Sequence, residues 1–149
     1  MPKRETKQHF AADFDLDVMS GETDLFRWFL LCYLFGKPIQ SNVAVTTWKI
    51  LIEARLDTPW SIVELSNYVL VSALNQGGYT RYQHVTADGL QTCVGQLIHS
   101  YEGSLDLMLQ SSENEDEFSK RLQTLYGVGP KIAEIFMREL EEYFARRIE

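Results

Sequence analysis

Residues Gly127, Gly129, Pro130 and Lys131 form the part of the sequence best suited to chemistry, within the stretch "LYGVGPKIAEIFMREL". The two glycines permit positive φ angles and let a ligand approach the backbone with no Cβ in the way. Pro130 favours the first turn of the helix that follows and carries no amide that would need an acceptor. The free amides near Gly127, Gly129 and Lys131 would then lie at the positive end of a helix, where one phosphate oxygen can bind. The glycine turn therefore predicts a phosphate-binding site.

Lys131 is the side chain of this stretch that could also act as a nucleophile. An amine attacks only as the free base, so a catalytic lysine needs a pKa lowered by burial or by neighbouring charge. A lysine that pairs with a phosphate, or that is simply solvated, needs neither condition. The residue types leave both roles open for Lys131.

Metal and thiol chemistry are not indicated elsewhere in the sequence. Cys32 and Cys93 lie far apart inside apolar helical patterns, and neither has a histidine or cysteine at zinc-ligand spacing. Two cysteines alone cannot hold an iron–sulfur cluster. We therefore expect two buried free thiols and no required cofactor.

The composition restricts the class of protein. A chain of 149 residues, 45% of them hydrophobic and 23% charged, fits one globular domain with a sizeable core. The formal net charge of -7 argues against a broad basic surface, so any contact with nucleic acid has to come from a local feature. No apolar run has the length of a signal peptide or of a membrane span, and we expect a cytoplasmic location with no membrane partner.

The elements that position the glycine turn are all expected to be helices, because no alternating β-branched run predicts a strand. A first helix is expected from Thr23 to Gly36, with Gly36 as its left-handed cap. Ser41 is expected to cap the second helix, and Thr58 the third, with Pro59 at its first helical position. Further helices are expected over residues 66–78, 81–101, 105–110 and 113–125.

The chain divides into an N-terminal tail or arm, residues 1–20, and a single domain, residues 21–149. The tail begins with the basic stretch "MPKRETK", and short polar tails of this kind are usually disordered. Trp28, Trp48 and Trp60 fall within the apolar stripes of their helices and are predicted to belong to the core.

The glycine turn resembles the helix-hairpin-helix motif, which reads hydrophobic, any, Gly, hydrophobic, Gly, any, Lys, any, Ala and is matched by residues 125–133. Roughly residues 23–147 resemble the six-helix barrel of the endonuclease III-like DNA glycosylases of base excision repair, the HhH-GPD superfamily. In that family a Thr-Pro helix, a second short helix, a Gly-Tyr or Gly-Leu turn, a long helix ending in glycine and the hairpin follow in this order. The turn at Gly78-Tyr79 and the hairpin are the most specific points of the resemblance.

The resemblance implies a DNA-binding protein that holds a backbone phosphate at Gly127, Val128, Gly129 and Lys131. In bifunctional members of the family, the lysine at the position of Lys131 attacks the sugar C1′, displaces the damaged base and forms a Schiff base. Lys37, in "FGKPIQ", falls near the loop that in relatives enters the gap left by a flipped base.

A monovalent cation is also implied by the resemblance. Sodium or potassium would be held behind the phosphate by the backbone carbonyls of Gln123, Leu125 and Val128.

Two parts of the family's catalytic machinery have no evident counterpart in this sequence. Relatives carry a catalytic aspartate beyond the hairpin, in a stretch resembling "VDTH", whereas this sequence reads "EEYFARRIE" about where that stretch would begin. Glu149 lies near the expected distance, but a terminal carboxylate is a poor candidate for a positioned catalytic group. A second helical domain, which encloses the base-accepting cleft and often carries a four-cysteine cluster, is also not found. We therefore expect DNA binding without catalysis.

Two alternatives remain open. One is a DNA glycosylase/AP lyase that uses Lys131 and is completed by a homodimer or a partner protein. The other is a protein-interaction module that has lost nucleic acid, which the acidic net charge favours.

Overall fold

The most apolar segment of the sequence forms the central helix of the protein. In the computed structural model, which describes residues 9–147, this helix is α1 (Glu22–Phe35). Between Leu25 and Leu34 every residue except Arg27 is buried. A helix that is apolar all round has to be enclosed by other elements, and α1 contacts α2, α6 and α8.

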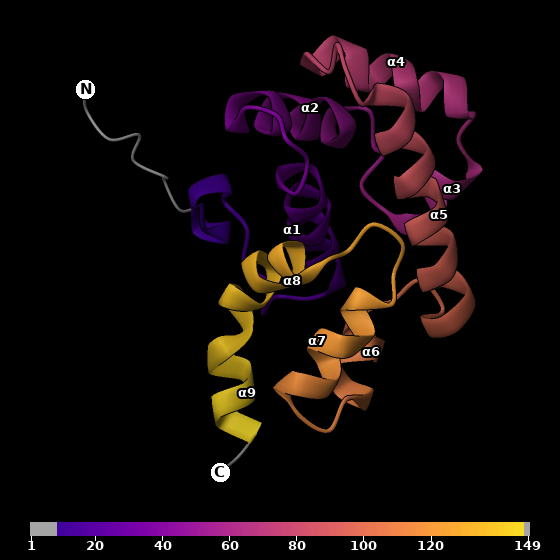
Figure 1. Ribbon diagram of the computed structural model, residues 1–149. Helices are drawn as coiled ribbons and strands as arrows, with labels where there is room; N and C mark the ends of the chain where they lie inside the picture. Colours follow the sequence, from indigo (N-terminus) through magenta and orange to yellow (C-terminus); the bar gives the residue numbers. More distant parts are fainter. Residues whose placement is uncertain (1–8, 148–149) are drawn as a thin grey trace.

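Two groups of helices surround α1 (Figure 1). The first group is α2 (Ser41–Glu53), α3 (Pro59–Glu64), α4 (Asn67–Gly77) and α5 (Gln83–Tyr101). The second is α6 (Leu105–Ser111), α7 (Glu115–Gln123), α8 (Pro130–Met137) and α9 (Glu141–Arg147), with short 3-10 turns at η1 (Ala11–Phe14) and η2 (Arg138–Leu140). No strand occurs within residues 9–147, so the all-helical prediction is confirmed.

Helix ends that are encoded by neighbouring residues lie where the sequence predicts them. Thr58 caps α3 by accepting a hydrogen bond from the Ser61 amide at 3.1 Å, and Pro59 is the first helical residue. Ser66 is the N-cap of α4, and Gly78 ends that helix with a left-handed φ of 109°. These caps need only a few consecutive residues, which is why the sequence suffices to predict them.

Two helix ends differ from the prediction. Gly36 has a φ of -71° and is not a left-handed cap. It is required for packing, because a Cβ at this position would lie 2.4 Å from Cδ1 of Ile132 on α8. Ser41 is the first residue of α2, and Gln40 takes the N-cap position without a side-chain hydrogen bond.

The prediction for the tryptophans holds for two of the three. Trp28 is buried and donates its indole N–H to the Phe136 carbonyl of α8 at 3.2 Å, and the buried Trp48 donates to the Arg27 carbonyl at 2.9 Å. Trp60 is 50% exposed, so its assignment to the core is wrong. It lies on α3, a helix of six residues in which only Pro59 and Ile62 are buried.

Residues 9–20 pack against the bundle. Ala11, Leu16 and Val18 are buried there, and the Ala11 amide donates to Oε1 of Glu139 at 2.7 Å. The Phe14 ring meets the Trp48 ring edge to face, with 5.6 Å between the ring centroids. The remainder of the predicted tail, residues 1–8, lies outside the described residues, as does Glu149.

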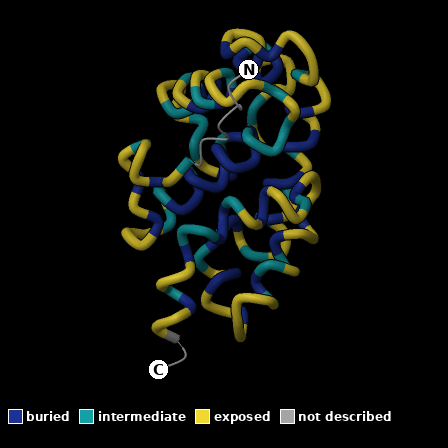
Figure 2. The backbone as a smooth tube through the Cα atoms, turned by 60° about the vertical axis from the view of Figure 1, so that its left-hand side comes forward, coloured by how far each residue is buried: buried dark blue, intermediate teal, exposed yellow. Residues whose placement is uncertain are grey.

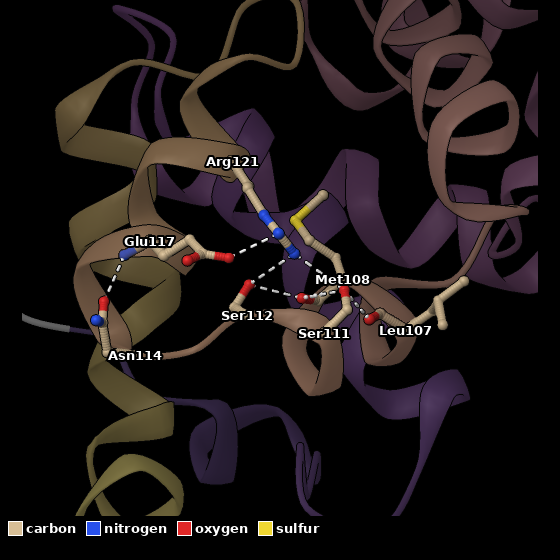
Figure 3. A network of polar contacts seen from close by, with 7 residues as sticks. All are labelled: Leu107, Met108, Ser111, Ser112, Asn114, Glu117 and Arg121. Carbon is tan, nitrogen blue, oxygen red and sulfur yellow. Dashed lines mark hydrogen bonds and ion pairs between the residues drawn. The ribbon is translucent and has the colours of Figure 1, made fainter.

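Polar contacts fix α7, the helix that leads into the glycine turn, to α6 (Figure 3). Arg121 of α7 pairs with Glu117 at 2.6 Å and donates to the hydroxyls of Ser111 at 3.0 Å and Ser112 at 3.3 Å. The Asn114 side chain caps the start of α7 by accepting from the Glu117 amide at 2.9 Å. The end of α7, where the turn begins, is therefore held in place from α6.

The backbone segments with buried residues lie in the interior of the molecule, whereas many of the peripheral turns carry exposed residues (Figure 2). The buried apolar residues, from Ala11 to Phe144, form one connected cluster. Within residues 9–147, no helix combines the length and apolar character needed to cross a membrane.

Candidate functional site

The glycine turn joins α7 to α8 and begins after Gln123. Gly127 has a φ of 80°, as predicted, in a region that side chains with a Cβ rarely occupy. Gly129 has a φ of -97° and extends the chain into α8 as its N-cap, so it does not use the positive φ that a glycine permits. A Cβ at Gly129 would nevertheless meet no protein atom within 4 Å. The space in front of Gly129 is therefore open to a ligand.

The backbone amides of the turn fall into two sets. The Tyr126 amide donates to Oε1 of Gln96 on α5 at 2.6 Å, and the Val128 amide donates to the Leu125 carbonyl at 3.1 Å. The amides of Gly127, Gly129 and Lys131 have no acceptor in the described part of the chain. Pro130 has no amide, and the first backbone hydrogen bond of α8 is donated by Ala133 to the Gly129 carbonyl. The N–H groups of Gly127, Gly129 and Lys131 are therefore available for a ligand at the start of α8.

The apolar residues of the turn lock the two helices together, as the sequence predicts. Leu125, Val128 and Ile132 are all buried. Val128 therefore contributes to the site through the conformation of the turn, because its side chain is in the core and its amide is already paired.

Tyr33 of α1 packs against the glycine turn at Gly127, a contact that no pattern in the sequence indicates. Its side chain is fully buried, and its hydroxyl has no hydrogen-bond partner among the described residues. A Cβ at Gly127 would lie 2.4 Å from this hydroxyl, and a Cβ at Gly89 of α5 would lie 2.8 Å from it. Tyr33 thus occupies the space that both glycines leave free. Burial raises the pKa of Tyr33 above its ordinary value, so the hydroxyl stays protonated at neutral pH.

Lys37 lies beside this tyrosine. Its Nζ is 5.0 Å from the centroid of the Tyr33 ring, within range of a cation–π interaction. Lys37 is partly buried, and this partial burial lowers the pKa of its amine. The adjacent Gly36 packs on Ile132, in the first turn of α8. The structure therefore brings the predicted Lys37 loop and the glycine turn together through Tyr33 and the Gly36–Ile132 contact.

Lys131 is exposed in the first turn of α8, with no ion pair or hydrogen bond to its side chain in residues 9–147. A catalytic lysine that works with a carboxylate would need that carboxylate beside it, and no carboxylate in the part of the chain that the structure describes forms an ion pair with Lys131. An exposed ammonium next to two unpaired amides is suited to attract an anion.

Within residues 9–147, no group of three or more His, Cys, Asp or Glu side chains lies close enough together to hold a metal ion. The predicted cation would rely on the backbone carbonyls of Gln123, Leu125 and Val128. Of these, the Leu125 carbonyl accepts the Val128 amide. Coordination of a monovalent ion by these carbonyls stays a prediction.

The two cysteines are buried free thiols, as predicted. Burial raises the pKa of Cys93 to about 12, so its thiol is not a nucleophile at neutral pH. Burial also raises the pKa of Cys32. Both side chains therefore serve packing, including that of α5 near Tyr33 and Lys37.

Gly89 and Gln96 of α5 are further residues that sequence reasoning missed. Gly89 makes room for Tyr33, and a Cβ there would also lie 3.3 Å from Cε1 of Tyr126. A glycine inside a helix costs stability relative to alanine and can mark a close approach, but α5 also contains Gly95, which makes none, so the sequence alone does not single out Gly89. Gln96 fixes the turn through the Tyr126 amide, and no local pattern indicates this contact.

Comparison with known proteins supplies no relative for this site. No family model matches the sequence, and no curated protein and no solved structure matches the chain.

Proposed function

We propose that this protein binds DNA by holding a backbone phosphate at the glycine turn. The observation that carries the proposal is the set of three amides, at Gly127, Gly129 and Lys131, that have no acceptor in residues 9–147. Amides at the start of a helix carry partial positive charge and bind phosphate oxygens without a basic surface. This mode of binding suits a chain with a net charge of -7.

Three surrounding features support a phosphate as the ligand. The missing Cβ of Gly129 leaves the approach to the amides open. The exposed Lys131 adds a positive charge at the same helix start, and Lys37 lies on the neighbouring loop, over the Tyr33 ring. The resemblance of the turn to the helix-hairpin-helix motif favours the phosphate of a DNA strand over a free phosphate ion.

Substitution of Gly129 by valine tests the proposal without disrupting the fold. The φ of -97° suits valine and the space is open, so we expect the free energy of unfolding to change by no more than about 1 kcal/mol. The new side chain would stand in front of the amides and weaken DNA binding at least tenfold in fluorescence anisotropy at low salt. Gly95→Ala on α5 is the matched control, because its Cβ would meet only Val63 at 3.9 Å, and it should bind like the wild type. Unchanged DNA binding by Gly129→Val would refute the proposal.

The two alternatives from the sequence are outcomes of accompanying measurements. Borohydride trapping on DNA with an abasic site would yield a covalent adduct that depends on Lys131 if the protein were an AP lyase. Absence of binding to any DNA at low salt would favour a protein-interaction module. Competition by inorganic phosphate at equal concentration would identify the free ion as the ligand.

A further inference from the structure

Tyr126 is an exposed aromatic side chain held in a defined position on the glycine turn. It is 55% exposed, and its amide donates to Gln96 of α5 at 2.6 Å. One edge of its ring rests where Gly89 lacks a Cβ, because an added Cβ would lie 3.3 Å from Cε1 and 3.6 Å from Cδ1. The rest of the ring faces solvent. The protein thus keeps a glycine inside α5, at a helix-propensity cost of about 1 kcal/mol relative to alanine, beside two tyrosine rings.

Further exposed side chains continue from Tyr126 along the first turns of α5. Val85 precedes Gly89 by four residues and therefore lies on the same side of α5. It is exposed, as is Tyr82 at the N-cap of the helix. The Arg81 guanidinium lies over the Tyr82 ring, 5.2 Å from its centroid. Exposed aromatic and apolar side chains with a cation beside one of the rings favour a partner that offers flat rings and negative charge.

We propose that Tyr126 stacks on an unpaired base of single-stranded nucleic acid, the backbone phosphate of which is bound by the neighbouring amides. The inference rests on the proposed function and specifies the strand state of the ligand. Tyr126 directly precedes Gly127, so one nucleotide can reach both the ring and the amides. A base inside a duplex is already stacked on both faces and presents no free face to Tyr126, whereas an unpaired base does.

The charge of the protein makes stacking necessary for useful affinity. Few cations surround the turn, and with a net charge of -7 counterion release can supply only a small part of the binding free energy. One base–aromatic stack changes affinity by about 5- to 150-fold and does not depend on salt. Stacking by Tyr126 would therefore compensate for the weak electrostatic contribution.

The experiment compares three labelled ligands of equal length in fluorescence anisotropy: a thymidine oligonucleotide, an oligomer with the same backbone but abasic residues, and a duplex. Tyr126→Leu should weaken binding of the thymidine oligonucleotide by about 5- to 150-fold and leave the abasic oligomer unaffected. Its salt dependence should be unchanged, because no phosphate contact is lost. Tyr126→Phe should bind like the wild type. Tyr68→Leu, which removes an 80% exposed tyrosine from α4, is the matched control and should also bind like the wild type.

Each result decides between the two proposals. Equal binding of the thymidine oligonucleotide by the wild type and Tyr126→Leu, both shown to be folded by circular dichroism, would overturn the stacking inference and leave phosphate binding intact. Tighter binding of the duplex than of the single strand would also overturn it. Failure of the wild type to bind any of the three ligands would overturn the proposed function itself, and stacking with it.

Discussion

At the scale of single residues, the site depends on the contact between Gly127 and Tyr33. Gly127→Ala would place a Cβ 2.4 Å from the Tyr33 hydroxyl while the backbone holds a φ of 80°. The steric conflict and the left-handed conformation together should lower the free energy of unfolding by about 2–4 kcal/mol. Urea denaturation measures this loss.

A double-mutant cycle shows whether the hydroxyl is the cause. Tyr33→Phe removes an unpaired buried hydroxyl and should leave stability unchanged or raise it by about 1 kcal/mol. Combined with Gly127→Ala it should restore part of the loss, because the closest atom is then absent. Strict additivity of the two changes would contradict the account of Tyr33 as the support of the turn.

At the scale of elements, contacts between helices distant in sequence decide where the turn lies. Glu22, at the start of α1, accepts the amides of Leu105 and Asp106 at 2.9 and 2.8 Å and thereby caps α6. Burial raises the pKa of Glu22, although these hydrogen bonds act in the opposite direction. The carboxylate therefore binds a proton more readily in the folded than in the unfolded state.

The pH dependence of stability follows from this raised pKa. The contribution of Glu22 is fully present below the unfolded pKa, near 4.5, and is lost as pH rises through the higher folded value. The free energy of unfolding of the wild type, relative to that of Glu22→Gln, should therefore rise as pH falls from 7 toward 4.5. Paired urea titrations at several pH values measure the difference, in which groups shared by both proteins cancel. A difference that stays constant, or that becomes smaller as the pH is lowered from 7 toward 4.5, would contradict the prediction.

The difference between local contacts and contacts that join helices distant in sequence explains how far the sequence predicts the fold. The caps at Thr58, Ser66 and Gly78 are encoded by adjacent residues and were predictable. The role of Gly36 was not, because it depends on Ile132, nearly a hundred positions further along the chain. Trp60 was assigned to the core because the apolar pattern of so short a helix does not indicate which of its sides is covered.

The candidate site shows the same division. The glycine turn, Lys131 and the buried residues beneath the turn follow from a local pattern. Tyr33, Gly89 and Gln96 belong to other helices and enter the site only through tertiary packing. The pairing of the Tyr126 amide likewise depends on Gln96, which no spacing within the turn indicates.

At the scale of the whole molecule, the net charge of -7 limits how DNA can be bound. We expect a shallow salt dependence, because only the phosphates near the turn are neutralised. Lys131→Ala should reduce the slope of log Kd against log salt concentration by about 0.7–0.9, the value for one phosphate contact. Lys49→Ala, which removes an exposed lysine from α2, is the control and should leave the slope unchanged. Identical slopes for the wild type and Lys131→Ala would contradict a phosphate contact by Lys131.

Phosphate binding at the glycine turn involves particular N–H groups, and a ¹H–¹⁵N NMR titration with a short DNA oligonucleotide observes these groups directly. The amide signals of Gly127, Gly129 and Lys131 should shift most, because these groups gain an acceptor. The amides of Tyr126 and Val128, which already donate within the protein, should shift less. Signals of Gly127, Gly129 and Lys131 that stay in place while DNA perturbs another surface would contradict the account.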